Sequence, residues 1–288
     1  MNGAWLHCAD DGERASPAAR RNDVHRRPDS RRSDIAFVAV AALLFVASVA
    51  GTVAWGEAMS QMQGMEMPGG WTMSMVWMRM PGGSWLASAA SFVGMWTLMM
   101  VAMMLPLLVP TFWRLRRDLR EAGETRIVWL TALAAFGYFL AWALVGVAVY
   151  ALGLAVAQLA MRQAAVSQVV PLLAGAAIVI AGLLQLSAWK VRVLACWQHA
   201  QFRGPVPARA GPALRHGLQL AGQCSACCVG AMTVLLVVGV MDLKAMAAVA
   251  AAITLERLVP ARVAVARLIG VAAIVGGLMV IVDAALFA

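Results

Sequence analysis

Three of the five cysteines in this chain lie within one short run, C-S-A-C-C, from Cys224 to Cys228. In a helix Cys224 and Cys228 are one turn apart, Met232 continues the same row, and Cys227 is displaced from Cys224 by only about 60°. Thiolates and thioethers are soft ligands that favour Cu(I), whereas a structural zinc site needs four donors, and the usual second Cys/His pair is missing here. The run therefore predicts a Cu(I) site. The alternative is that the cysteines pack as small hydrophobic side chains.

A second group of soft ligands occupies segment 57–84, where eight methionines alternate with glycines. A thioether carries no charge and cannot be protonated, so Met-x-Met and Met-x-x-Met spacings suit capture of Cu(I) or Ag(I) in an oxidising compartment, where thiols would be lost. The alternative is that these methionines pack with neighbouring tryptophans at a membrane interface. The candidate ligands are Met62, Met65, Met67, Met73, Met75, Met78 and Met80.

Methionines also recur every four residues in the apolar stretch that follows, at Met95, Met99 and Met103. Met100 and Met104 form a second pair that points away from Met95 on a helical projection, so a single site cannot use all five. A methionine row inside a membrane helix often serves only to fill gaps in packing. Because the row directly follows the Met-rich segment, we expect Met95, Met99 and Met103 to be metal ligands of intermediate strength.

The elements that must position these residues are membrane helices. The chain is 62% hydrophobic and 13% charged, a composition that excludes an ordinary soluble domain. We predict an all-α fold, a polytopic transmembrane helical bundle with about six to seven spans, because one run of about 14 residues is short of the roughly 20 that a span needs. The apolar runs are Ile35–Trp55, Trp85–Leu108, Ile127–Leu152, Pro171–Trp189, Leu218–Val240, the short Ala245–Leu258, and Leu268–Phe287. Pro106 and Pro110 are expected to end the second helix.

The predicted domain organisation is simple. Residues 1–34 are rich in charge and poor in large apolar side chains, which predicts a disordered cytoplasmic tail. Residues 35–288 form the transmembrane domain, with a Met-rich extracytoplasmic loop at 56–84. The first apolar run is longer than the hydrophobic core of a signal peptide, so we interpret it as a retained span.

Basic residues orient the predicted bundle. If the tail is cytoplasmic, 20 of the 23 lysines and arginines fall on that side of the membrane, as the positive-inside rule requires. We therefore predict a multi-pass protein of the bacterial inner (plasma) membrane with a cytoplasmic N-terminus. The lipid bilayer explains the net charge of +9 without a nucleic-acid partner. Ionisable and polar groups within spans, such as Gln185, Asp242, Glu256 and Asp283, are functional candidates because burying them is costly; Glu256 with Arg257 could form a structural ion pair.

Short motifs spread over residues 85–260 resemble those of a known family. They are Met95-Trp96, Met99-Met100, Met103-Met104-Leu105-Pro106, Gly137-Tyr138, Trp142, Ala181-Gly182-Leu183, Gln185, Lys190, Cys224, Cys227-Cys228, Met232, Gly239-Val240-Met241-Asp242-Leu243, Met246, Glu256 and Pro260. In these motifs the chain resembles the bacterial family of predicted metal-binding integral membrane proteins, a domain of unknown function. The resemblance implies a polytopic membrane protein that binds metal, and it implies no established substrate.

The chain departs from that family pattern at a few positions. The segment after Lys190 has one cysteine, Cys196, with His199 nearby, where the family pattern has two cysteines. The residue before the paired cysteines is Ala226 in place of glycine, and Val229 follows them in place of an aromatic residue. Neither of the latter changes removes a metal donor.

Together these features predict a non-enzymatic membrane protein that binds, and transports or delivers, a soft metal ion, with Cu(I) favoured over other soft metals. A metallochaperone is a candidate partner, and the oligomeric state is left open. No ATP-binding motif accompanies the spans. Two alternatives remain open. One is a thiol-disulfide oxidoreductase that uses Cys224, Cys227 and Cys228. The other is a structural or assembly subunit.

Overall fold

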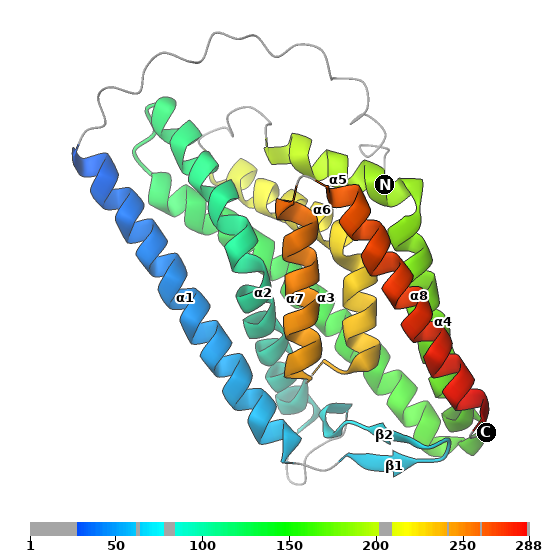
Figure 1. Cartoon of the computed structure of the whole chain (residues 1–288). Helices are drawn as coiled ribbons and strands as arrows, with labels where there is room; N and C mark the ends of the chain where they lie inside the picture. The colour runs from blue at the N-terminus through cyan, green and yellow to red at the C-terminus, as the bar shows by residue number, and fades with distance from the viewer. Residues whose placement is uncertain are drawn as a thin grey trace.

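A computed structural model of the chain describes residues 28–61, 64–77, 84–201, 209–240, 242–259 and 261–286. Over these residues the chain forms eight α-helices, one short 3-10 helix (η2) and a two-stranded antiparallel hairpin (Figure 1). In chain order the elements are α1 (Pro28–Ser60), β1 (Met65–Met67), β2 (Trp71–Met73), η2 (Met75–Trp77), α2 (Trp85–Glu121), α3 (Ile127–Arg162), α4 (Ala164–Leu186), α5 (Ala188–Gln201), α6 (Ala210–Val238), α7 (Leu243–Leu258) and α8 (Arg262–Leu286).

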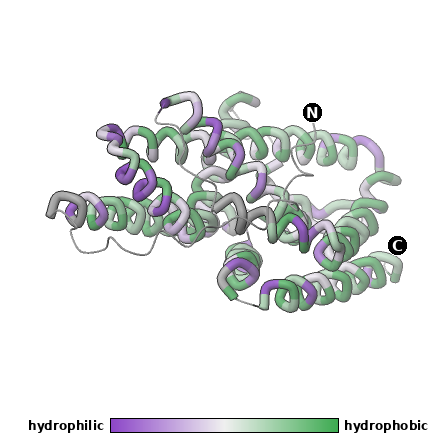
Figure 2. Tube along the Cα trace, turned by 90° about the horizontal axis from the view of Figure 1, so that it is seen from above, coloured by the Kyte–Doolittle hydropathy of each residue, from purple (hydrophilic) through white to green (hydrophobic). Residues whose placement is uncertain are grey.

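The predicted fold class, an all-α membrane bundle, is confirmed. Six helices within the described ranges are long and apolar enough to cross a membrane: α1, α2, α3, α4, α6 and α8. Hydrophobic residues make up most of the length of these helices, and hydrophilic residues occur in short stretches (Figure 2). The weak sixth apolar run corresponds to α7, which has 16 residues and is shorter than the roughly 20 residues of a full span. The chain is therefore a multi-pass membrane protein.

The expectation that prolines end the second helix was wrong. α2 continues through both Pro106 and Pro110 to Glu121. Each proline removes one intrahelical hydrogen bond, a loss that membrane helices tolerate when neighbouring helices pack around the freed backbone groups. Leu107 and Leu108, between the two prolines, are buried in the core of the bundle. Packing of this kind favours a continuous helix over a break.

The helices are arranged so that α2, α3 and α6 form the centre of the bundle. α1 crosses at a slant on one flank and contacts α2, while α8 packs along α4 on the opposite flank (Figure 1). α7 packs against α6 and α8, and α5 lies across one end of the bundle against α6. The β1–β2 hairpin lies at the other end, which we call the hairpin end (Figure 1).

Glycines allow α3 and α6 to approach closely. Gly217 faces the carbonyl oxygen of Ala134, and Gly137 faces the carbonyl oxygen of Leu214. A Cβ atom added at Gly137 would lie only 2.6 Å from that Leu214 oxygen. Small residues at helix crossings let backbones come into van der Waals contact, which drives association of membrane helices. The same contact brings Tyr138 of α3 next to α6.

The hairpin is fixed to the α3–α4 junction. Gly69 and Gly70, with φ of 104° and 75°, form the turn between the two strands, where side chains other than glycine would be strained. Ser167 donates a hydrogen bond through Oγ to the carbonyl oxygen of Pro68 at 2.7 Å, and Trp71 donates through Nε1 to the carbonyl oxygen of Ser167 at 3.0 Å. These two bonds hold the hairpin against the start of α4.

At the opposite end, polar contacts join α1 to α2. α1 begins at Pro28, before the first apolar run. Arg120 forms an ion pair with Asp34 at 2.7 Å, and Arg116 donates to the Ser33 hydroxyl at 2.6 Å. Since the middle of α1 is largely exposed to lipid, these contacts fix its position at this end of the bundle.

The close contact between α3 and α6 predicts that alanine lowers stability at Gly217 but not at a glycine with open space around it. Gly217→Ala places a methyl group on the carbonyl oxygen of Ala134 and forces α3 and α6 apart, so we expect a loss of about 1 to 3 kcal/mol in stability. Gly94→Ala is the control, because nothing lies within 4 Å of a Cβ at that helical position. Thermal unfolding in detergent, followed by circular dichroism, measures both. Equal melting temperatures for the two variants would contradict the packing interpretation.

Candidate metal centre

The three clustered cysteines lie in the middle of α6. The helix begins at Ala210 and ends at Val238, so Cys224 is far from both ends. The predicted apolar run begins only at Leu218, so the helix extends further ahead of the cysteines than the run indicates. Cys224, Cys227 and Cys228 are 0%, 4% and 1% exposed, and all three are free thiols. The site is therefore an interior one, surrounded by α2, α3, α5 and α7.

Three sulfur atoms from two helices come together at this point. Sγ of Cys224 lies 4.0 Å from Sγ of Cys228 and 3.7 Å from Sδ of Met104 on α2. We call Cys224, Cys228 and Met104 the sulfur group. With metal–sulfur bonds of about 2.3 Å, two ligands of a trigonal metal ion lie about 4.0 Å apart. The distances from Cys224 to Cys228 and to Met104 are therefore close to those between ligands of a three-coordinate soft metal.

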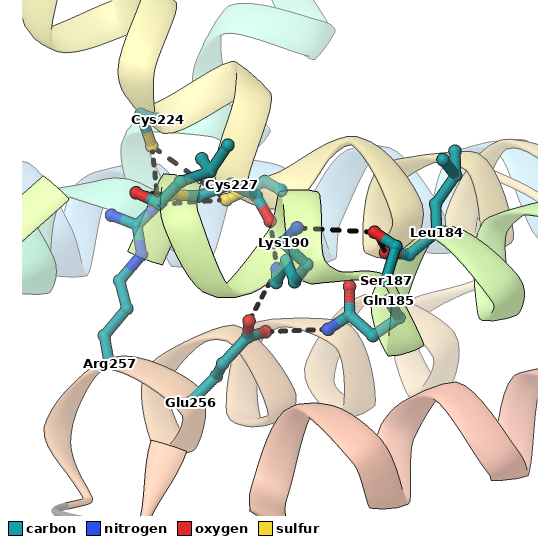
Figure 3. A network of polar contacts seen from close by, with 10 residues as sticks. Leu184, Gln185, Ser187, Lys190, Cys224, Cys227, Glu256 and Arg257 are labelled. Atoms are coloured by element: carbon teal, nitrogen blue, oxygen red, sulfur yellow. Dashed lines mark hydrogen bonds and ion pairs between the residues drawn. The ribbon is translucent and has the colours of Figure 1, made fainter. Parts of the chain in front are cut away.

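The sulfur group accepts hydrogen bonds from two polar side chains. The Tyr138 hydroxyl donates to Sγ of Cys224 at 3.0 Å, and Nη2 of Arg257 donates to Sγ of both Cys224 and Cys228 at 3.1 Å. Figure 3 shows Arg257 extending from α7 toward Cys224. A guanidinium beside two sulfurs stabilises them as thiolates, the form in which cysteine binds metal.

A buried ion pair lies beside the sulfur group. Nζ of Lys190 contacts Oε1 of Glu256 at 2.5 Å and donates to the carbonyl oxygen of Cys227. Nε2 of Gln185 donates to the other carboxylate oxygen of Glu256 at 2.9 Å (Figure 3). Lys190 and Glu256 are only 2% and 4% exposed. Through Lys190 and Glu256 the pair connects α5, α6 and α7, and it fixes the residue that precedes Arg257.

Cys227 has a different environment from the other two cysteines. Its Sγ lies 3.7 Å from the carbonyl oxygen of Val193 on α5. The thiol thus faces α5, whereas Cys224 and Cys228 share the guanidinium of Arg257. Two of the three predicted thiol ligands therefore belong to the sulfur group, and Cys227 lies on the α5 side of it.

The methionine that contacts a thiol is Met104, which the sequence analysis had assigned to the less favoured row. Met95, Met99 and Met103, the predicted ligands, are all buried in the same core along α2, and so is Met232 on α6. No group of three His, Cys, Asp or Glu side chains suited to a metal occurs within the described ranges. The third soft donor beside the two thiols of the sulfur group is the thioether of Met104.

The predicted ligands of the Met-rich segment lie at the hairpin end. Met65 pairs with Met73 and Met67 with Trp71, so one face of the hairpin carries three thioethers and an indole. Met67 and Met73 are buried, and Met65 is exposed. Met62, Met78 and Met80 lie outside the described residues, and Met75 is in η2. The backbone of Cys196 and His199 belongs to α5.

Sequence reasoning missed the roles of Lys190 and Arg257 at this centre. An ion pair between Glu256 and Arg257, neighbours in sequence, was one of two interpretations, but Glu256 pairs with Lys190 and Arg257 reaches the sulfurs. The available signal was the presence of a lysine, a glutamate and an arginine near membrane segments, where charges are retained for a partner or a function. Their partners could not be found without knowing how α5, α6 and α7 pack.

The buried ion pair predicts strong destabilisation when one partner is removed. Glu256→Leu leaves the Lys190 ammonium buried without its carboxylate, which we expect to lower stability by about 3 to 5 kcal/mol. The double variant Lys190→Met with Glu256→Leu removes both charges, so it should be more stable than the single variant. Denaturant unfolding in detergent compares the two. A single variant as stable as the double would mean that the ion pair contributes nothing.

Comparison with protein families gives one match. The sequence model of the PpoB2 family, described as a copper chaperone, matches residues 93–280, well over half of the chain. No curated protein and no solved structure matches the chain. The matched range includes the whole sulfur group, Arg257 and the Lys190–Glu256 pair. The expectation of a copper-handling membrane protein is confirmed in this family: the chain belongs to the PpoB2 copper chaperone family.

Proposed function

We propose that this protein holds Cu(I) at the sulfur group as a carrier within the membrane. The observation that supports this most directly is that three sulfur atoms lie close together beside the guanidinium of Arg257. Sγ of Cys224 is 3.7 Å from Sδ of Met104 and 4.0 Å from Sγ of Cys228. Two thiolates and a thioether form a soft, low-coordinate donor set, which suits Cu(I) better than zinc. The family supplies copper as the cargo, and the geometry suggests where it is held.

Access from the hairpin end is the second part of the proposal. Met65, Met67 and Met73 share one face of the hairpin and would collect the ion. α2 begins at this end, and its methionines follow one another inward from Met95 to Met104. Weak thioether sites in series allow an ion to leave each site as easily as it enters, which movement through a membrane protein requires.

The basic residues support an orientation for this route. The sequence assigns 20 of 23 lysines and arginines to the side opposite the hairpin, and 18 remain there when the two that lie at the buried centre, Lys190 and Arg257, are left out (20 − 2 = 18). We therefore propose that the protein lies in the bacterial inner membrane with the start of α1 and the residues before it on the cytoplasmic side, and that the hairpin faces the extracytoplasmic side. A metallochaperone would then receive copper from, or give copper to, one of the two faces.

A carrier role fits the thiols better than a redox role does. Disulfide exchange requires an accessible thiolate, and catalytic thiols are commonly activated at a helix N-terminus. Cys224 is fully buried in the middle of α6, and Cys227 faces α5. The same burial favours a bound metal ion, because it protects Cu(I) and the thiolates from oxidation.

The two kinds of cysteine predict different effects on copper binding. Cys224→Ser and Cys228→Ser each remove a donor from the sulfur group, so we expect affinity for Cu(I) to fall by at least about tenfold. Cys227→Ser is the matched control, since it lies on the same helix outside the group and should retain copper. Anaerobic titration of detergent-purified protein with Cu(I) against a competing chelator measures this. Equal losses in all three variants would contradict the assignment.

The proposed route predicts that the hairpin methionines affect the rate of copper uptake but not the affinity for copper. Replacing Met65, Met67 and Met73 together by Leu keeps their volume and removes the thioethers, so we expect slower copper loading with unchanged affinity at equilibrium. Loading of protein in vesicles, followed over time by elemental analysis, compares this variant with one that carries Met279→Leu, an exposed methionine on α8. Unchanged loading rates would remove the hairpin from the route.

A further inference from the structure

We infer that Arg257 restricts the sulfur group to monovalent metal ions. This inference rests on the proposed function, because it concerns the same site, and it assigns a specificity role to a residue that is not itself a ligand. Nη2 of Arg257 donates to both cysteine sulfurs at 3.1 Å, so its positive charge lies as close to the thiolates as a third ligand would. The guanidinium remains charged in all protein environments.

The ion pair of Lys190 and Glu256, next to the site, brings two charges that cancel each other. Lys190 and Glu256 form an ion pair with atoms 2.5 Å apart, and both side chains are buried. This pair adds no net charge to the centre. The charge that directly contacts the two cysteine sulfurs is the positive charge of Arg257, and the ligand thiolates and the bound ion would add their own.

The sum of these charges favours one class of ion. Two thiolates, Arg257 and a monovalent ion add to zero. With a divalent ion the same groups carry one positive charge, in a site where Cys224, Cys228 and Tyr138 are all buried. An uncompensated charge is costly in an apolar interior. The cost falls on Zn(II), Cd(II) and Cu(II), and it spares Cu(I) and Ag(I).

Coordination number alone could also disfavour divalent ions, since zinc prefers four donors. The two causes are separable because they depend on different residues. Coordination number is set by the sulfur group, and the charge is set by Arg257. A change at Arg257 that leaves Cys224, Cys228 and Met104 intact therefore isolates the effect of charge.

The test is a competition between Ag(I) and Cd(II), two thiophilic ions that differ in charge. Purified protein in detergent is equilibrated anaerobically with both ions, and retained metal is measured by elemental analysis and by metal–thiolate absorption in the ultraviolet. Arg257→Gln removes the charge, Arg257→Lys keeps it, and Arg215→Gln is the matched control, an equal charge change at an exposed position of α6. Because one charge is worth a large free energy at this distance, we expect Arg257→Gln to shift the Cd(II)-to-Ag(I) ratio upward by about tenfold or more.

The parent, Arg257→Lys and Arg215→Gln are expected to keep the preference for Ag(I). An unchanged ratio in Arg257→Gln, or an equal shift in Arg257→Lys, would overturn the inference and leave the copper site intact. If Arg257→Gln does not fold, the parent decides: uptake of Cd(II) as readily as Ag(I) overturns the inference. A parent that retains neither ion, nor Cu(I), overturns the proposed function and the inference with it.

Discussion

Two buried cysteines that are to bind a metal as thiolates need a cation close by, and this requirement explains much of the arrangement around α6. Buried charge is tolerated only when it is paired and hydrogen-bonded. Arg257 supplies the charge, and Tyr138 supplies a further donor. Tyr138 reaches Cys224 from α3. Arg257 reaches both sulfurs from the last turn of the 16-residue helix α7, so its side chain points into the bundle.

The remaining interactions hold these groups in place. Glycines bring α3 against α6, which places Tyr138 over Cys224. The ion pair of Lys190 and Glu256 fixes the end of α7, while Lys190 also binds the backbone at Cys227. α2 passes through two prolines without a break and delivers Met104 to the third position of the sulfur group. The centre thus combines side chains from five helices: α2, α3, α5, α6 and α7.

Composition and apolar runs were sufficient to predict a helical membrane bundle, since a lipid environment leaves few other solutions for the backbone. The sequence also predicted which side chains could serve as soft donors, because clustered thiols and thioethers suit Cu(I), although redox chemistry and packing were alternatives for the same residues. The thioether that contacts the thiols, that of Met104, could not be predicted. Helical projection placed Met104 in a separate row from Met95, yet both rows are buried, because α2 is surrounded by helices on more than one side. Likewise, Glu256 and Arg257 are neighbours in sequence but point to different partners, a choice made by the packing of α5 against α6.

Complete burial of Cys224 has a kinetic consequence. Ligand exchange at a soft metal ion is fast when an incoming thiol can reach it, but here no outside donor can approach without movement of the surrounding helices. Collective helix motions take microseconds to seconds. Under the proposed function, the lifetime of a bound ion would therefore depend on how often the surrounding helices separate, as well as on the strength of the metal–sulfur bonds. Such a centre would hold its cargo for long periods and release it when the bundle opens.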